Sequence, residues 1–230
     1  MHKIQIPQDA IDRAIARRGA LQVFDHLEPS RTALLVIDLQ NGFMAPGQPG
    51  ELAQARAIVD NVNRLAGTLR EAGGHVVWVR HTHGGPAAGQ PWPRFLEFAA
   101  AGWGQALNAA LVPGGEGHAL YPALQTRPED DVVDKTRFSA LIQGSSDLHE
   151  RLQSRGIDTV IVTGTITNVC CESTARDAMM LNYKVHFVSD ANAARSDAEH
   201  NATLGNMLLW FADVRSTDEL IQLVRTPKGV

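Results

Sequence analysis

The sequence predicts an α/β fold, in which helices cover both faces of a doubly wound, mostly parallel six-stranded sheet. Short apolar runs alternate with stretches of helical spacing, a pattern typical of parallel strands that are buried on both faces. The 230 residues, of which 44% are hydrophobic and 20% charged, suffice for one large domain with a substantial core.

The first half of the chain supplies three predicted strands and one long helix. The strands are Thr32–Asp38, His75–Arg80 and the short Asp131–Asp134. Between the first two, apolar residues recur at helical spacing at Leu52, Ala55, Val59, Val62, Ala66 and Leu69. Gly73 and Gly74 end this helix, because glycine readily adopts the left-handed conformation found at helix C-termini.

The second half continues the alternation. The predicted strands are Asp158–Thr163, Lys184–Ser189 and a very short one at Val214 and Arg215. A helix over about 168–182 follows the first of them. Three further helices begin at serines: at Ser145 or Ser146 before Leu148 and Leu152, at Ser196 with Glu199, and at Ser216 with Glu219. The last two pairs have the spacing of a capping box.

Two segments lie outside this alternation. Residues 1–30 form an N-terminal extension to a domain of residues 31–230, and a helix over 9–18 is expected to pack on the body or on another subunit. Residues 81–130 are a long insertion, which in a compact domain is typically a lid or a pocket wall. Its aromatic residues, Trp92, Phe95, Phe98 and Trp103, are too many for a disordered linker, so we predict a partly helical lid.

Charge and composition narrow the class of protein. The net charge is −4 and the basic residues form no block, so we expect neither nucleic acid nor an acidic membrane surface as a partner. No apolar run approaches membrane-spanning length and no signal peptide is recognisable, which favours a cytoplasmic protein. The only cysteines, Cys170 and Cys171, are adjacent, which argues against a disulfide scaffold and a multi-thiolate zinc site.

Three reactive side chains follow predicted strands. Asp38 ends the first strand, Lys135 follows the third, and Cys170 begins the helix after the fourth. In a doubly wound sheet, ligands bind beyond the carboxyl ends of strands, where the strand order reverses. We therefore expect these residues to share one crevice.

Helical periodicity separates the two cysteines. Cys171 begins a stripe with Thr174, Ala175, Ala178 and Met179 that faces the sheet, so it is interpreted as a buried small hydrophobe. Cys170 lies about 100° away in the first turn, where free N–H groups and the helix dipole favour a thiolate nucleophile. The alternative is that both thiols are inert core residues.

Asp38 and Lys135 have roles that suit a cysteine nucleophile. Asp38 ends an apolar strand, where it can accept the thiol proton and later deliver it to a departing amine. Lys135 can stabilise the carboxylate and the thiolate by its charge. Taken alone, the aspartate can equally cap a loop, and the lysine can be a solvated surface residue.

Histidines raise the possibility of a metal. His81 and His83 form His-x-His after the second strand, and His118 lies in the same insertion. This spacing suits zinc, but no Asp, Glu or Cys stands immediately beside the pair. We predict no metal and no other cofactor, with a zinc site as the alternative. The run Gly164-Thr-Ile-Thr-Asn168 lacks the glycine spacing and the lysine of a phosphate loop.

Three runs of sequence carry a resemblance to a known family. They are Ala33-Leu-Leu-Val-Ile-Asp-Leu-Gln-Asn41, Asp134-Lys-Thr-Arg-Phe-Ser-Ala140 and Thr163-Gly-Thr-Ile-Thr-Asn-Val-Cys-Cys-Glu-Ser-Thr-Ala-Arg-Asp-Ala178. Together they resemble the isochorismatase-like cysteine hydrolases, which include nicotinamidases and N-carbamoylsarcosine, biuret and ureidoacrylate hydrolases. The resemblance spans about Thr32 to Val224 and implies a Rossmann-type fold.

The resemblance also implies a catalytic site. Asp38, Lys135 and Cys170 match the family's triad, with Cys170 as the nucleophile. A cis peptide bond is implied between Thr165 and Ile166, and the N–H groups of Ile166 and Cys170 are implied to form the oxyanion hole. The reaction is then cleavage of a small amide, carbamoyl or ureido C–N bond through a thioester.

Two departures from motifs of this family narrow the reaction that the resemblance implies. Nicotinamidases carry an Asp-x-His motif and a later His that bind a metal, whereas this chain has Arg80-His-Thr-His83. True isochorismatases, which hydrolyse a vinyl ether, lack the cysteine that is Cys170 here. The run Thr167-Asn-Val-Cys-x-Glu-Ser-Thr-x-Arg-Asp177 most closely resembles the ureidoacrylate type. The alternatives are a vinyl-ether hydrolase and a non-catalytic binding member.

Substrate-binding residues are expected in two places. Trp92, Phe95 and Trp103 of the insertion are the predicted apolar walls of the pocket. Arg137 is predicted either to bind a substrate carboxylate or to pair with Asp134 or Glu172, and Thr167 is assigned to substrate binding. The small-molecule substrate itself is not predicted, and a homo-oligomer (dimer or tetramer) is expected.

Overall fold

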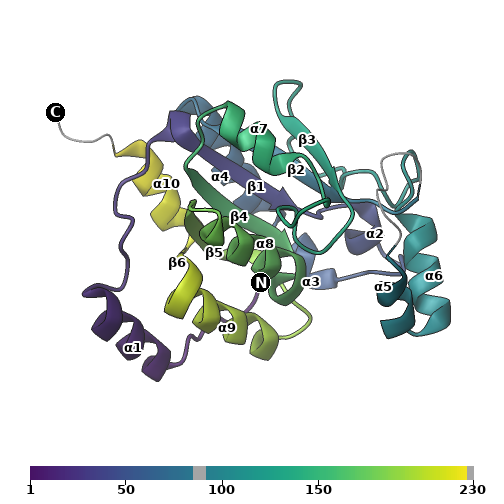
Figure 1. The fold of residues 1–230 in the computed structure, drawn as a ribbon, viewed down its shortest axis with the longest axis horizontal. Coiled ribbons are helices and arrows are strands. Elements are labelled where there is room, and N and C mark those ends of the chain that lie inside the picture. Colours follow the sequence, from purple (N-terminus) through teal and green to yellow (C-terminus); the bar gives the residue numbers. More distant parts are fainter. Residues whose placement is uncertain (85–91, 227–230) are drawn as a thin grey trace.

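The computed structural model, which describes residues 1–84 and 92–226, contains a parallel sheet of order β3-β2-β1-β4-β5-β6 (Figure 1). The strands are β1 Thr32–Ile37, β2 His75–His81, β3 Asp131–Lys135, β4 Thr159–Thr165, β5 Lys184–Ala193 and β6 Asp213–Arg215. Every neighbouring pair of these strands is parallel. The predicted six-stranded, doubly wound sheet is confirmed, and its strand order reverses between β1 and β4.

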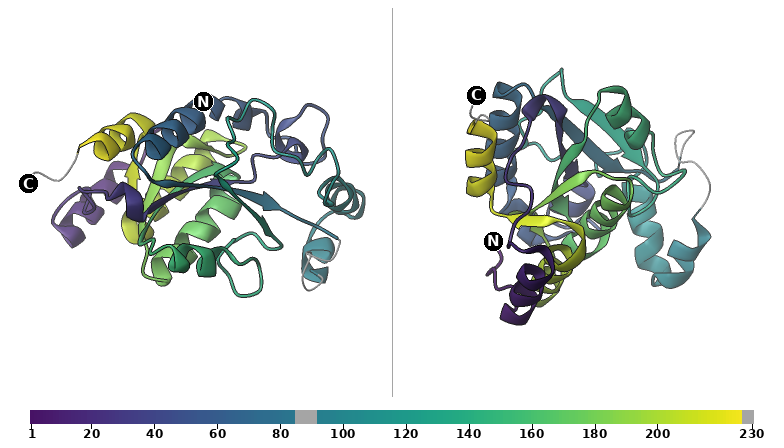
Figure 2. Two further views of the ribbon diagram at one scale, coloured as in Figure 1. Left: turned by 90° about the horizontal axis from the view of Figure 1, so that it is seen from above. Right: turned by 60° about the vertical axis from the view of Figure 1, so that its left-hand side comes forward.

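Helices cover both faces of the sheet (Figure 2). One face packs against α1 Gln8–Arg18, α7 Leu148–Ser154, α8 Glu172–Met180 and α9 Asp197–Asn206. The other packs against α3 Ala53–Arg56, α4 Val59–Glu71 and α10 Thr217–Arg225. Within β1, Leu35 and Ile37 face the first layer, and Leu34 and Val36 face the second. This alternation explains why the strand is apolar throughout.

The structure corrects several element boundaries. The single helix predicted from Leu52 to Leu69 is two helices, α3 and α4, because the N–H groups of Ala57 and Ile58 bond to carbonyls only three residues back. Strands β4 and β5 extend beyond their predicted ends, and Gly164 pairs with Asn192 in the added part. The extension of β5 was not predicted because polar residues follow its apolar run.

The helix starts follow the predicted serines in different ways. Ser216 and Glu219 form the complete capping box of α10. Ser196 accepts the Glu199 N–H at the start of α9, while the Glu199 carboxylate accepts from the Ser196 hydroxyl instead of a backbone group. At α7 the N-cap position belongs to Asp147, and the Ser146 hydroxyl accepts the N–H of Leu148.

Helix α1 packs on the body of the protein. Ala10 and Ala14 are buried, and the Arg17 guanidinium donates to the carbonyl of Leu209 in the π-helical turn η4, Met207–Phe211. The division at residue 30 stays a prediction. Within residues 1–84 and 92–226, none of the helices combines the length and apolar character needed to cross a membrane.

Gly164 lies where the strand order reverses. Its φ of 121° is in the region that favours glycine, and a Cβ there would lie 2.1 Å from the Ile37 carbonyl oxygen. Gly164 is also the register partner of Ile37. Only glycine allows this close approach of β1 and β4. The approach brings Asp38, the residue after β1, towards the chain that follows β4.

A buried histidine on β5 makes stability sensitive to acid. Within the described residues, His186 has no hydrogen-bond partner at either ring nitrogen, and burial lowers its pKa from 6.5 to about 3. A depressed folded-state pKa stabilises the fold above the unfolded pKa, and this stabilisation is lost as pH falls from 6.5 towards 3. The slope approaches about 1.4 kcal/mol per pH unit for one such group.

We therefore expect His186→Leu to flatten the loss of unfolding free energy between pH 6.5 and about 4, measured by urea denaturation. His26→Gln, at a histidine that is not buried, is the control and should keep the wild-type slope. An unchanged slope in His186→Leu would show that His186 is not the titrating group.

Candidate active site

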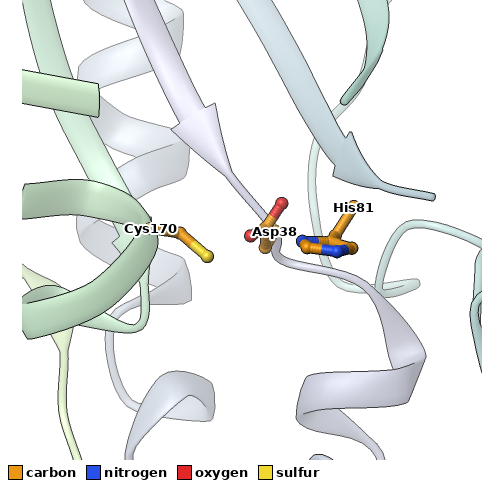
Figure 3. Close-up of side chains that lie close together, drawn as sticks. All are labelled: Asp38, His81 and Cys170. Carbon is orange, nitrogen blue, oxygen red and sulfur yellow. The ribbon is translucent and has the colours of Figure 1, made fainter. Parts of the chain in front are cut away.

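The three predicted catalytic residues reach one crevice from three elements. Asp38 follows β1 with a φ of 53°, Lys135 is the last residue of β3, and Cys170 lies in the π-helical turn η3, Thr167–Cys171, after β4. The left-handed backbone of Asp38 is uncommon for a residue with a side chain and typical of functional sites. In Figure 3 the Asp38 carboxylate lies between the Cys170 thiol and the His81 ring.

The site is buried and its groups are in contact. Lys135 Nζ lies 2.9 Å from Asp38 Oδ2, and their side chains are 0% and 1% exposed. One polar atom each of Asp38, His81 and Cys170 lies within 4.8 Å of the other two. The structure thus brings together the acid, the lysine and the thiol that sequence reasoning selected.

Burial sets the protonation of these groups. It raises the pKa of the Cys170 thiol, and the nearby charge of Lys135 only partly opposes this. Burial also raises the pKa of Asp38, again opposed by Lys135. Burial alone would lower the pKa of Lys135, but the charge of Asp38 raises it.

These shifts correct one expectation. The start of the helix was expected to favour a thiolate, whereas burial raises the pKa of Cys170 and so favours the neutral thiol. A base must therefore take its proton, and Asp38 is the adjacent carboxylate. The ammonium of Lys135 compensates the charge of that carboxylate in the buried site.

Cys171 is turned away from this crevice. It is fully buried, its Sγ lies 4.0 Å from the Thr163 carbonyl oxygen, and it packs in the same cluster as Ala175 and Ala178. Helical periodicity predicts this difference between the two cysteines. Met179, the last residue of the predicted stripe, is instead exposed.

The chain between β4 and Cys170 has the features expected of an oxyanion site. The peptide bond joining Thr165 to Ile166 is cis. Ile166 and Cys170 line the same cavity. The N–H groups of Val169 and Cys171 both donate to the Ile166 carbonyl oxygen, which fixes the turn around Cys170.

A cavity of about 150 Å³ opens onto the thiol. The insertion contributes Phe95 from α5, Pro93–Phe98, and Trp103 and Leu107 from α6, Ala101–Ala110. The expectation that these helices cover a pocket is met for the described part of the insertion; residues 85–91 lie outside it. The remaining walls are Asp38, Phe43, Gly50, His81, His83, Phe138, Thr165, Ile166, Val169 and Arg195.

Trp92 and Arg137 lie beside this cavity and line a second, outer pocket. The Arg137 guanidinium stacks 5.2 Å from the centre of the Trp92 ring and donates to the Thr136 carbonyl oxygen. The acids considered as its partners are paired elsewhere, Asp134 with Arg80 and Glu172 with Arg176. Arg137 therefore lies at the outer pocket, and its binding of a substrate carboxylate stays a prediction.

Thr167 also differs from expectation. Its hydroxyl bonds to His200 Nδ1 at 2.9 Å, and His200 Nε2 lies 2.8 Å from the Ser189 carbonyl oxygen. A carbonyl can only accept, so Nε2 carries the proton and Nδ1 accepts from Thr167. Thr167 therefore fixes η3 to α9 instead of facing the cavity.

The described histidines do not form the metal site considered from the sequence. His81 and His83 lie together with ring centres 4.6 Å apart, whereas the His118 ring contacts the Thr82 hydroxyl. Asp38, His81 and Cys170 are close enough to share an ion, but the Lys135 ammonium lies 2.9 Å from Asp38 and 3.0 Å from His81 Nδ1. A positive charge in contact with two members of the set opposes a metal ion there, so the set does not fit a resident metal.

Sequence reasoning missed several cavity residues. Phe138 lies three residues after Lys135, and Arg195 follows β5. The carboxyl end of β5 meets the same edge of the sheet as β1 and β4, so its position was a usable signal for Arg195. Phe43 and Leu107 carried no such signal, because their approach depends on loop packing.

Comparisons with known proteins agree with this geometry. A family model described as the isochorismatase domain matches residues 32–219. Ureidoacrylate amidohydrolase RutB of Pseudomonas savastanoi pv. phaseolicola is 32% identical, covering 84% of this chain and 83% of that protein. Nicotinamidase 3 of Arabidopsis thaliana is also 32% identical, covering 82% and 86%. The crystal structure of a cysteine hydrolase from Pseudomonas syringae pv. phaseolicola 1448A matches with a TM-score of 0.77 and 31% identity, covering 86% and 94%.

Proposed function

Because the chain belongs to the isochorismatase family and is a C–N hydrolase, we propose that it cleaves a small amide, carbamoyl or ureido substrate with Cys170 as nucleophile. The observation that carries the proposal is the buried contact of Asp38, Lys135 and Cys170 at the base of one cavity.

The proposed reaction has two steps. Cys170 Sγ bonds to the substrate carbonyl carbon while its proton passes to Asp38. The C–N bond then breaks and Asp38 gives that proton to the leaving nitrogen. Water next attacks the thioester, its hydroxyl stays on the carbonyl carbon, and its other proton returns by way of Asp38 to the departing sulfur. The N–H groups of Ile166 and Cys170 hold the oxyanion in both steps.

The cavity supports a small substrate. Its volume of about 150 Å³ lies below the roughly 300–1,000 Å³ usual for drug-sized ligands. Aromatic side chains, among them Phe95, Trp103 and Phe138, form much of the wall. RutB, whose name gives ureidoacrylate as its substrate, and the nicotinamidase are relatives that act on small molecules of this kind.

One expected result tests this function. The purified protein should release ammonia from at least one member of a panel of small amides, N-carbamoyl compounds and ureides, and turnover should survive exhaustive chelation. The physical reason is that Lys135 occupies the place a metal would need beside Asp38 and His81. Absence of ammonia from every compound would contradict the function, as expected of a vinyl-ether hydrolase or a non-catalytic member. Loss of turnover on chelation, restored by zinc, would contradict metal independence.

Two expectations about the whole protein stay predictions. One is a homo-oligomer, dimer or tetramer, for which exposed Met180 and Trp210 are available apolar surface. The other is a cytoplasmic location. Nicotinamide is expected to be a poor substrate, since the run Arg80-His-Thr-His83 lacks the aspartate of the Asp-x-His motif and has His81 two residues before His83.

A further inference from the structure

His81, the last residue of β2, is a buried cavity residue that the proposed mechanism does not use. Its side chain lines the cavity that holds Cys170, and the residue is 3% exposed. Its Nε2 is buried and has no hydrogen-bond partner among the described residues. An unpartnered polar atom at such a place is costly unless a ligand satisfies it.

The contacts of the Lys135 ammonium determine which ring nitrogen of His81 carries the proton. The ammonium has three donors and no acceptor, and its Nζ lies 2.9 Å from Asp38 Oδ2, 3.0 Å from the Arg137 carbonyl oxygen and 3.0 Å from His81 Nδ1. An ammonium can donate but not accept a hydrogen bond, so Lys135 is the donor in its contact with His81 Nδ1. His81 Nδ1 must therefore be the acceptor and carry no proton.

A neutral imidazole with a bare Nδ1 carries its proton on Nε2. The ring remains neutral because burial, and then the charge of Lys135, hold the pKa of His81 well below its usual value. The other groups that lower this pKa by charge, His83, Arg137 and His118, act in the same direction. His81 is thus held as the Nε2–H tautomer, and that N–H is the group without a partner.

We propose that His81 is a substrate-binding residue whose Nε2–H donates to a carbonyl oxygen in the part of the substrate remote from the scissile bond. The proposal rests on the proposed function and names its substrate class: small amides or ureides that carry a second carbonyl group. His81 and Cys170 are close enough for one small molecule to contact both.

The apolar cavity makes this donor selective. A substrate with the second carbonyl oxygen satisfies Nε2–H, whereas an analogue without it leaves the donor buried and unpaired. His83 also lines the cavity, and its Nε2 has no partner among the described residues, but no polar contact within that part of the chain fixes which ring nitrogen carries the proton. We therefore assign the hydrogen-bond donor to the Nε2–H of His81, whose tautomer is fixed by Lys135.

The first test reads the tautomer directly. We expect long-range 1H–15N spectra of 15N-histidine-labelled Cys170→Ala protein to show, for His81, a bare Nδ1 and a protonated Nε2 from about pH 6 to 8. Adding 3-oxobutanamide should shift the Nε2 resonance, while butanamide, which differs by one carbonyl oxygen, should not. A protonated Nδ1, or equal shifts with both amides, would overturn the proposal.

The second test separates the two nitrogens of the ring by substitution. In His81→Asn the side-chain oxygen still accepts from Lys135 but the Nε2 donor is lost, whereas His81→Gln keeps a donor near the Nε2 position. The ratio of kcat/KM for 3-oxobutanamide over butanamide should fall about three- to tenfold in His81→Asn, mainly through KM, and stay near wild type in His81→Gln.

His118→Gln is the matched control, because that buried histidine contacts Thr82 and not the cavity. It should keep the wild-type ratio. An unchanged ratio in His81→Asn, with kcat/KM lowered equally for both amides, would overturn the proposal and show that His81 acts only by positioning Lys135. The spectra can be recorded without turnover. A protein that releases no ammonia from any amide would contradict the proposed function, whereas the spectra test the role of His81 independently.

Discussion

Replacing Cys170 by alanine or serine is expected to reduce kcat/KM at least about a thousandfold, while Cys171→Ser keeps most of the activity. Cys170 lines the cavity beside Asp38, whereas Cys171 is fully buried against the sheet. A serine at position 171 can donate to the Thr163 carbonyl, which Cys171 Sγ already approaches, so this variant should fold.

The measurement is steady-state ammonia release on a substrate from the panel, with circular dichroism to verify folding. Acid quenching of wild type during turnover, followed by peptide mass mapping, should place the acyl group on Cys170. Equal loss of activity in the Cys170 and Cys171 variants, both natively folded, would contradict the assignment of the nucleophile.

The protonation state of the Cys170 thiol follows from its burial in the same site. Because burial raises the pKa of Cys170, the thiol must lose its proton during attack and not before it. A mechanism with a resting thiolate would make the enzyme sensitive to alkylation at neutral pH. The neutral thiol beside a buried carboxylate instead explains why the site needs a base as close as Asp38.

The sequence predicted those parts of the fold and site that depend on local pattern. Asp38 and Lys135 were recognisable because each lies at the carboxyl end of a predicted strand, and periodicity separated Cys170 from Cys171. The direction of a side chain in a loop depends instead on long-range packing. Thr167 was assigned to the substrate, but His200, far along the chain, binds its hydroxyl.

Electrostatic state was the least predictable property. Periodicity places Cys170 at a helix start, but only the assembled structure shows that Cys170 is buried, which raises the pKa of its thiol. The role of His81 also depended on a partner that is distant in sequence. Lys135 is its register neighbour in the sheet, and spacing along the chain cannot reveal which imidazole nitrogen the ammonium occupies.

Substitutions in the Asp38–Lys135 pair should cause the largest loss of unfolding free energy. Lys135→Met leaves a buried carboxylate without its cation, and Asp38→Asn leaves a buried ammonium without its anion. Removing one partner of such a pair costs about 3–5 kcal/mol of unfolding free energy. The double variant Asp38→Asn/Lys135→Met removes both charges, so it should lose less than the sum of the single variants.

All three variants should lose at least about a hundredfold in kcat/KM, because each removes the base or the charge that holds it. The control is Arg64→Met, which breaks the exposed pair of Arg64 with Asp218. We expect that substitution to change the unfolding free energy by less than about 1 kcal/mol. Strictly additive losses in the double variant would mean that the two buried groups do not interact.

The pH dependence of Lys135→Met distinguishes a lost charge from lost packing. Burial already raises the pKa of Asp38, and removing Lys135 takes away the charge that lowers it. A carboxyl whose folded-state pKa is raised contributes stability below its unfolded pKa of about 4, and that contribution is lost as pH rises through the folded pKa. The deficit of Lys135→Met relative to wild type should therefore shrink as pH falls from about 7 towards 4. Urea denaturation across that range measures it, and a deficit that is constant with pH would show that the lysine contributes through its methylene packing and not through its charge.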